Sequence, residues 1–235
     1  MSTIASSLIS VKRRIAEAEA AFGRPPGSVK LLSVSKTQPA EALAEAFAAG
    51  QTAFGESYLQ EALAKQAVLA ALPIEWHFIG PIQANKTRPI AERFAWVHGV
   101  ERAKIADRLS AQRPVEAPPL QVCVQVNSSG EASKSGVSPA ELPALVAHVA
   151  SLPRLRLRGL MAIPRPAADE AGQRAQFRVL RGLFEALGKQ GYELDTLSMG
   201  MSGDLEAAIA EGSTLVRVGT AIFGARAGFT PADAR

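Results

Sequence analysis

The chain is organised around the stretch Leu31-Leu32-Ser33-Val34-Ser35-Lys36-Thr37, which has the pattern of an apolar β-strand that ends in a lysine. Side chains alternate across a strand, so Leu32, Val34 and Lys36 share one face. Beside apolar residues the ammonium form of a lysine is disfavoured and its pKa falls, which makes the amine a nucleophile able to form a Schiff base. The alternative is a solvated lysine at a strand end, because lysines are rarely fully buried.

Eight short apolar segments alternate with helical patterns along the chain, and no linker separates them. The segments lie at about 29–35, 52–54, 74–79, 95–98, 120–126, 155–161, 194–198 and 214–218. This alternation predicts the α/β class and a single closed (β/α)8 barrel of the TIM type, formed by one domain over 1–235. A doubly wound open sheet is the alternative, although no G-x-G-x-x-G follows the first strand as a dinucleotide-binding version requires.

An extra helix is predicted before the first strand. Apolar residues recur at helical spacing from Ile4 to Ala18, and Gly23 ends the pattern. We expect this N-terminal helix, over 1–24, to pack on the main fold, and 227–235 to form a loose tail.

Composition and charge argue against several classes of protein. The 26 basic and 22 acidic residues give a formal net charge of +4, and the basic residues are scattered, so charge does not indicate nucleic-acid binding. The densest basic group, Arg154, Arg156 and Arg158, alternates with leucines as in a strand with one apolar and one polar face. No segment has the pattern of a membrane span, and we expect a cytoplasmic monomer.

The single cysteine, Cys123, lies inside an apolar run, so a disulfide within the chain is impossible and a buried thiol is expected. The three histidines are far apart in the sequence, and no zinc-binding motif is visible. The sequence therefore predicts no metal site.

Polar residues gather in the segments that follow the predicted strands, where the active sites of such barrels form. After the seventh strand, Ser202 precedes Gly203-Asp204 and a helix, so its hydroxyl and the neighbouring amides could face an anion. After the eighth strand, Gly219-Thr220 lets backbone N–H groups approach a ligand closely. Many such barrels bind phosphate at these two loops, although glycines that only make turns would give the same pattern.

Several blocks of sequence, in order, carry a resemblance to a known family. They are Ser33-Val34-Ser35-Lys36-Thr37, Phe54-Gly55-Glu56, Glu75-Trp76-His77-Phe78-Ile79-Gly80-Pro81-Ile82-Gln83, Asn85-Lys86, Ser133-Lys134-Ser135-Gly136, Arg158-Gly159-Leu160-Met161-Ala162-Ile163-Pro164, Gly200-Met201-Ser202 and Arg217-Val218-Gly219-Thr220-Ala221-Ile222-Phe223-Gly224-Ala225-Arg226. On these blocks the chain resembles the YggS/PROSC family of pyridoxal phosphate homeostasis proteins, whose fold is similar to the N-terminal barrel of bacterial alanine racemase. The resemblance spans the chain from the N-terminal helix to Arg226.

The resemblance implies a site for pyridoxal 5'-phosphate (PLP). Lys36 would hold PLP as a covalent Schiff base, and Arg217 would lie at the pyridine nitrogen. The other implied contacts are Ser202, Gly219 and Thr220 to the phosphate, and Met201, Asn85 and His77 elsewhere on the cofactor.

The implied place of Arg217 has a chemical consequence. An arginine stays protonated, so it cannot accept a proton from the ring and should keep the pyridine nitrogen unprotonated. An unprotonated ring is a poorer electron sink than a pyridinium. The cofactor would be held, yet weakly activated for carbanion chemistry.

The chain departs from the family pattern at two positions. The family usually has Asn after Phe-Gly-Glu, where this chain has Ser57, and often has Asp after Gly-Met-Ser, where this chain has Gly203. Asp204 is left to cap the following helix, so we expect the phosphate loop to be preserved.

The resemblance implies a protein that binds, buffers and delivers PLP, with PLP-dependent apoenzymes as partners, and without robust catalysis. Racemases with this barrel add a second domain that supplies a catalytic tyrosine, whereas the tyrosines here are Tyr58, just after the second strand, and Tyr192, before the seventh. His77 is the best substitute for a second base, and Lys134 is a candidate secondary lysine at the rim. Two alternatives remain open: a weak amino-acid racemase or other fold-type III PLP enzyme, and a cofactor-free Schiff-base lyase using Lys36 on a phosphorylated sugar.

Overall fold

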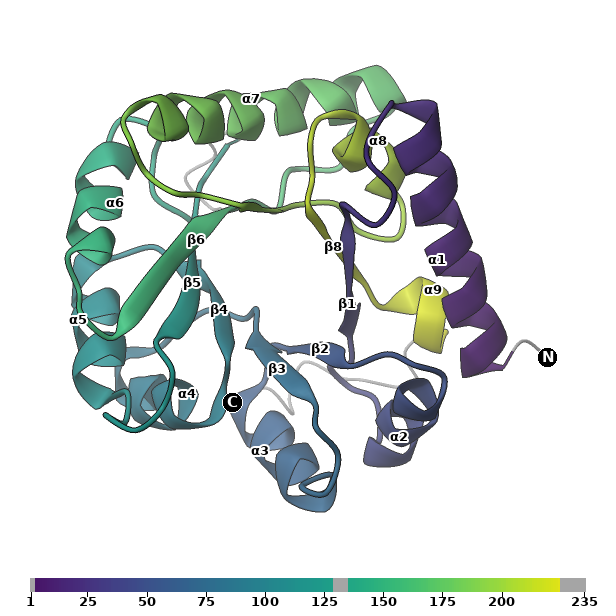
Figure 1. The fold of residues 1–235 in the computed structure, drawn as a ribbon, viewed down its shortest axis with the longest axis horizontal. Helices are drawn as coiled ribbons and strands as arrows, with labels where there is room; N and C mark the ends of the chain where they lie inside the picture. Colours follow the sequence, from purple (N-terminus) through teal and green to yellow (C-terminus); the bar gives the residue numbers. More distant parts are fainter. Residues whose placement is uncertain (1–2, 129–134, 225–235) are drawn as a thin grey trace.

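The computed structural model describes residues 3–128 and 135–224, which form a closed barrel of eight parallel strands with helices around it (Figure 1). The strands follow one another in chain order, and the last pairs with the first, so that Leu32 lies opposite Arg217. The predicted (β/α)8 barrel is therefore confirmed, and the pairing of the first and last strands excludes the doubly wound open sheet.

The elements lie within a few residues of their predicted positions. The strands are β1 Lys30–Val34, β2 Ala53–Glu56, β3 Glu75–Phe78, β4 Trp96–Val100, β5 Leu120–Gln125, β6 Leu155–Met161, β7 Thr196–Ser198 and β8 Leu215–Val218. The helices are α1 Ile4–Ala21, α2 Ala40–Ala48, α3 Leu59–Val68, η1 Ala84–Lys86 (a 3-10 turn), α4 Thr87–Arg93, α5 Ala103–Gln112, α6 Leu142–Ala150, α7 Glu170–Lys189, α8 Leu205–Ala210 and α9 Thr220–Phe223. The sequence does not predict α9, because four residues are too few to show a helical period.

The predicted N-terminal helix is α1, which lies on the outside of the barrel against α2, α8 and α9 (Figure 1). Its apolar stripe is buried, from Leu8 to Ala18. The buried carboxylate of Glu19 accepts hydrogen bonds from the backbone N–H groups of Gly27, at 2.9 Å, and Val29, at 2.7 Å. These bonds tie α1 to the segment that enters β1.

The barrel interior differs in chemistry from the apolar layer between the strands and the helices. Trp96, Cys123 and Met161 form a small apolar cluster, and buried polar side chains such as His98 and Arg217 lie beside it. Burial raises the pKa of the Cys123 thiol to about 12, so the predicted buried cysteine is confirmed. In the described ranges no helix is long and apolar enough to cross a membrane, and no group of His, Cys, Asp or Glu side chains could hold a metal ion.

A β-bulge interrupts the pairing of β6 with β5. The register with β5 shifts between Leu157, opposite Val122, and Gly159, opposite Cys123. The leucines of β6 pack in the outer apolar layer. Arg158 lies at the lower end of the barrel, where the strands begin, with its guanidinium carbon 4.7 Å from the centre of the Trp96 ring. At the bulge, a side chain on Gly159 would place its Cβ 1.8 Å from the carbonyl oxygen of Thr196, so only glycine fits.

We predict that Gly159→Ala lowers the free energy of unfolding by about 2–3 kcal/mol, because the new methyl group collides with the backbone of β7. The matched control is Gly182→Ala in α7, where the space around the glycine is open, and where alanine should raise stability by roughly 0.5–1 kcal/mol. Urea unfolding of both variants measures the difference. Equal effects in the two variants would contradict the close approach of β6 and β7.

Candidate functional site

Lys36 lies at the upper end of the barrel, where the strands end. It lines a small cavity of about 30 Å³ together with Gln38, Gly219 and Thr220. Because β1 and β8 are neighbours in the closed barrel, the structure brings the lysine beside the loop that follows β8. Three of the residues singled out in the sequence are thus in one place.

Two glycines allow the backbone to come close at this end. A Cβ on Gly219 would lie 3.0 Å from the carbonyl oxygen of Val34, so the end of β8 approaches the end of β1 closely, and a side chain there would require a small shift of the backbone. Gly200, in the loop after β7, has a φ of +95° and would place a Cβ 2.6 Å from that of Ala208. The loop after β7 therefore depends on glycine for its course.

The loop between β7 and α8 holds Met201 and Ser202. Met201 is partly exposed, and its backbone N–H donates to the carboxylate of Asp204 at 2.6 Å. The carbonyl oxygen of Ser202 accepts a hydrogen bond from Arg14 of α1, whose guanidinium also pairs with Glu206. Asp204 lies at the N-cap of α8 as expected, but its carboxylate bonds to Met201 and makes no capping bond to the helix.

Arg217 lies inside the barrel and is almost fully buried. Its guanidinium donates to the carbonyl oxygen of Ser198 at 2.5 Å, to the hydroxyl of Ser198 at 2.8 Å and to the carbonyl oxygen of Ala162 at 2.9 Å. Burial lowers the pKa of Arg217 to about 10, which leaves the group protonated at neutral pH. A fixed cation therefore lies in β8, two residues before Gly219.

His77 does not lie with Lys36. Its ring is buried and stacks on Trp96, with its Nε2 atom 2.8 Å from Glu75 and its Nδ1 atom 3.0 Å from His98. It lines a different pocket, at the lower end of the barrel, because β3 places it between these partners. This placement corrects the expectation that His77 contacts a cofactor held at Lys36.

The remaining residues named from the sequence lie apart from the Lys36 cavity or outside the described ranges. Asn85 is exposed in η1, after the end of β3. Tyr58 is half-buried at the N-cap of α3, and Tyr192 packs against the apolar core before β7. Lys134 lies outside the described residues.

A buried ionic cluster holds the turn that carries Lys36, and the sequence analysis did not identify it. Lys65 of α3 is buried and donates to the carboxylate of Glu56, at 2.8 Å, and to the carbonyl oxygen of Ser35, at 2.7 Å. Lys65 also pairs with Glu61, which accepts the backbone N–H of Thr37 at 2.6 Å. The residues on both sides of Lys36 are therefore bound to α3.

This cluster fixes an uncommon backbone conformation. Thr37 has a φ of +66°, the one positive φ of a non-glycine residue in the described part of the chain. Burial raises the pKa of Glu56, and the nearby Lys65 ammonium opposes the shift. A signal for the cluster exists in the sequence, since Glu61 and Lys65 are four residues apart on one helix, but the spacing does not reveal that the pair is buried.

Comparison with known proteins places the chain in a family. Residues 7–227 match the family described as "Alanine racemase, N-terminal domain". A relative from Pseudomonas aeruginosa, named pyridoxal phosphate homeostasis protein, is 64% identical over 233 residues, which is 99% of this chain and 100% of the relative. The chain belongs to the pyridoxal phosphate homeostasis protein family. The relative of the same name from Escherichia coli K12 is 53% identical and covers 96% of this chain and 98% of its own length.

Solved structures agree with this membership. PipY of Synechococcus elongatus PCC7942, solved with PLP bound, is 40% identical to this chain, with a TM-score of 0.79. The match covers 89% of this chain and 100% of PipY. Alanine racemase from Corynebacterium glutamicum is 19% identical to this chain, with a TM-score of 0.72. The match covers 97% of this chain and 62% of the racemase. At that identity the likeness to the racemase concerns the fold alone.

We predict that Lys65→Met destabilises this family member by about 3–5 kcal/mol, because it leaves the buried carboxylate of Glu56 without its cation. Lys104→Met, at an exposed lysine of α5, is the matched control and should change stability by less than about 0.5 kcal/mol. Urea unfolding gives both values. A loss no larger than the control's would mean that the cluster does not hold the turn.

Proposed function

We propose that this protein binds PLP at the upper end of its barrel, as a covalent Schiff base on Lys36, and serves PLP homeostasis by holding and delivering the cofactor. The observation that carries the proposal is the meeting of Lys36, Gly219 and Thr220 in one cavity. The names of the relatives and the PLP bound to PipY support it.

The residues of the upper end fit the chemistry of PLP. The cofactor supplies an aldehyde that condenses with a primary amine and a ring that can withdraw electrons. Lys36 supplies the amine, at a turn whose backbone is held on both sides by α3. Gly219 lies at the N-cap of α9 and has no side chain, so the backbone there is open to contacts with a phosphate.

Further contacts belong to the proposal by family resemblance. Ser202 and Thr220 each carry a hydroxyl that can donate to the phosphate. Met201 and Asn85 belong to loops that leave the carboxyl ends of β7 and β3, the same end of the barrel as Lys36.

Arg217 is the residue that favours holding over catalysis. It is a buried cation that only donates hydrogen bonds, so beside the pyridine nitrogen it can stabilise the unprotonated ring and cannot take a proton from it. A carboxylate in that place would favour the protonated ring, which is the stronger electron sink. Lys36 and Arg217 together therefore suit a binding protein.

We predict that the protein incubated with PLP shows a visible absorption band, and that borohydride fixes the cofactor on Lys36. Lys36→Ala should lose both the band and the labelled peptide, because Lys36 is the one amine that lines the cavity among the residues that the structure describes. Lys30→Met is the matched control: this lysine begins β1 and lines the pocket at the opposite end of the barrel, so the band should persist. A band that persists in Lys36→Ala would refute the site.

We also predict that the PLP-loaded protein does not exchange the α-proton of L-alanine in deuterated water faster than free PLP does. The physical reason is the unprotonated ring beside Arg217, which stabilises an α-carbanion poorly. Proton NMR follows the loss of the α-proton signal, with an alanine racemase as the positive control. Exchange well above the rate with free PLP would favour the racemase alternative instead.

Delivery to apoenzymes, the monomeric state and the cytoplasmic setting stay predictions of the same proposal. They are tested by transfer of PLP from the loaded protein to an apoenzyme, by sedimentation and by fractionation of the cell.

A further inference from the structure

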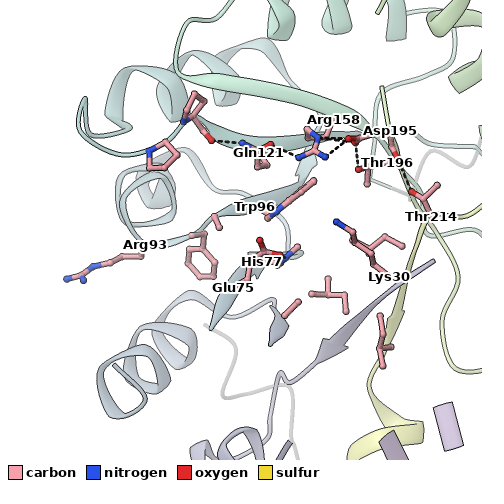
Figure 2. Close-up of a pocket in the computed structure, with 18 of the residues that line it drawn as sticks. Lys30, Glu75, His77, Arg93, Trp96, Gln121, Arg158, Asp195, Thr196 and Thr214 are labelled. Atoms are coloured by element: carbon pink, nitrogen blue, oxygen red, sulfur yellow. Dashed lines mark hydrogen bonds and ion pairs between the residues drawn. The ribbon is translucent and has the colours of Figure 1, made fainter. Parts of the chain in front are cut away.

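A second and larger pocket opens at the lower end of the barrel. Its volume is about 780 Å³, within the range of sites for small molecules. The residues that line it begin the strands, among them Lys30 of β1, Glu75 of β3 and Trp96 of β4 (Figure 2). Since all the strands are parallel, this pocket lies at the opposite end from Lys36, about 20 Å away along β1 at about 3.3 Å per residue.

The ammonium of Lys30 and the carboxylate of Glu75 both face this pocket, and they form no ion pair with each other. Arg158 is paired with Asp195; burial alone would raise the pKa of Asp195, but hydrogen bonds from Arg158 and Thr196 lower it. Lys30 makes no ion pair within the described ranges, and its side chain reaches into the open space in front of Trp96 (Figure 2). The carboxylate of Glu75 is half-exposed and is fixed by hydrogen bonds from His77 and Trp96, which lower its pKa.

A chain of hydrogen bonds joins Glu75 to Arg217 through the barrel interior. Its links are Glu75 to His77, 2.8 Å; His77 to His98, 3.0 Å; His98 to Ser198, 2.8 Å; and Ser198 to Arg217, 2.8 Å. The four links connect the lower pocket to the buried cation of β8.

The direction of this chain follows from its lower end. The carboxylate of Glu75 can only accept, so His77 donates from Nε2 and, as a neutral ring, accepts at Nδ1 from the Nε2–H group of His98. The Nδ1 atom of His98 then accepts the hydroxyl proton of Ser198, whose oxygen accepts from Arg217. Burial lowers the pKa of both histidines, in agreement with two neutral rings. Every donor therefore points from Arg217 toward the carboxylate in the lower pocket.

We propose that the lower pocket is a second ligand site, which binds a small zwitterion of the amino-acid type between Lys30 and Glu75, and that the interior chain transmits its occupancy to Arg217. The ligand's carboxylate would pair with Lys30 and its ammonium with Glu75, which leaves the rest of the pocket for a side chain. An ammonium on Glu75 weakens the bond that this carboxylate accepts from His77, and each following bond is polarised less. The binding part of the inference is independent of the function proposed above, and the coupling part rests on it.

Tryptophan fluorescence tests the binding. The chain has two tryptophans, so Trp76→Phe leaves Trp96, which lines the pocket and bonds to Glu75, as the sole reporter. The cofactor-free protein is titrated with the common L-amino acids, and the best ligand is compared with its analogues that lack the ammonium or the carboxylate. We expect a saturable change with the amino acid and binding about tenfold weaker or more for either analogue.

Matched variants assign the signal to the two charges. Glu75→Gln keeps an acceptor for His77, and Lys30→Met keeps the apolar stem, so both should fold and both should bind the amino acid about tenfold more weakly. Lys36→Ala should leave this binding unchanged, which separates the lower pocket from the cofactor end. The absence of a saturable signal with any amino acid, or an affinity unaltered in Glu75→Gln, would overturn the proposal.

The coupling is measured on the PLP-loaded protein as the change in the dissociation constant of PLP when the amino acid is added. The amino acid is used at the concentration that saturates the lower pocket of Lys36→Ala in the fluorescence titration. We expect the amino acid to change this constant about fivefold or more, and Ser198→Ala, which interrupts the chain, to remove the change. Amino acids that act on PLP directly would give the same change in Ser198→Ala and in Glu75→Gln, and that result would overturn the coupling. If the protein does not bind PLP at all, the fluorescence titration still decides the lower site.

Discussion

A guanidinium inside a closed barrel must find acceptors on the barrel wall, and this requirement organises the interior of the protein. Arg217 obtains them from Ala162, just after β6, and from Ser198, at the end of β7, so one side chain of β8 joins the ends of three strands. The Ser198 oxygen accepts from Arg217 and its hydroxyl donates to His98, which agrees with the tautomers that the acceptor-only carboxylate of Glu75 sets for both buried histidines. The polar interior is thus one connected arrangement, in which no member can be reversed alone.

A second buried cation acts in the same way at the ends of β1 and β2. Lys65 holds the carboxylate of Glu56 and the carbonyl oxygen of Ser35, and through Glu61 it fixes the amide of Thr37. Buried ion pairs add little net stability, because removing two charges from water costs about as much as their attraction returns. Their value here is geometric. The turn with Lys36 and the strand with Arg217 are each held by a cation that has few other places to find acceptors.

The sequence predicted those features that depend on local pattern. The alternation of strands and helices and the apolar stripe of α1 are written in spacing along the chain, and the barrel bears them out. The strand face predicted to include Lys36 is not formed, because β1 ends at Val34 and Lys36 lies in the turn that follows. The place of His77 was not predictable, because the level of a side chain in a barrel depends on strand register and not on its own neighbours in sequence.

Long-range contacts account for the other surprises. The pattern of β6 predicts a polar face, but only the contacts of Arg158 with Asp195 and Trp96 show that this side chain faces the lower pocket. Lys65 is an ordinary helical lysine by spacing, and its burial depends on a turn thirty residues earlier in the chain. A parallel barrel separates the starts of its strands from their ends, so β1 presents Lys30 to one pocket and the turn after β1 presents Lys36 to another. A protein that holds a cofactor and also gives it up needs two states of different affinity, and a ligand can favour one only through contacts that differ between them. The chain of hydrogen bonds that starts at Glu75 in the lower pocket ends at Arg217, so in the proposed coupling that residue is where contacts made at the lower end alter the hold of the upper end.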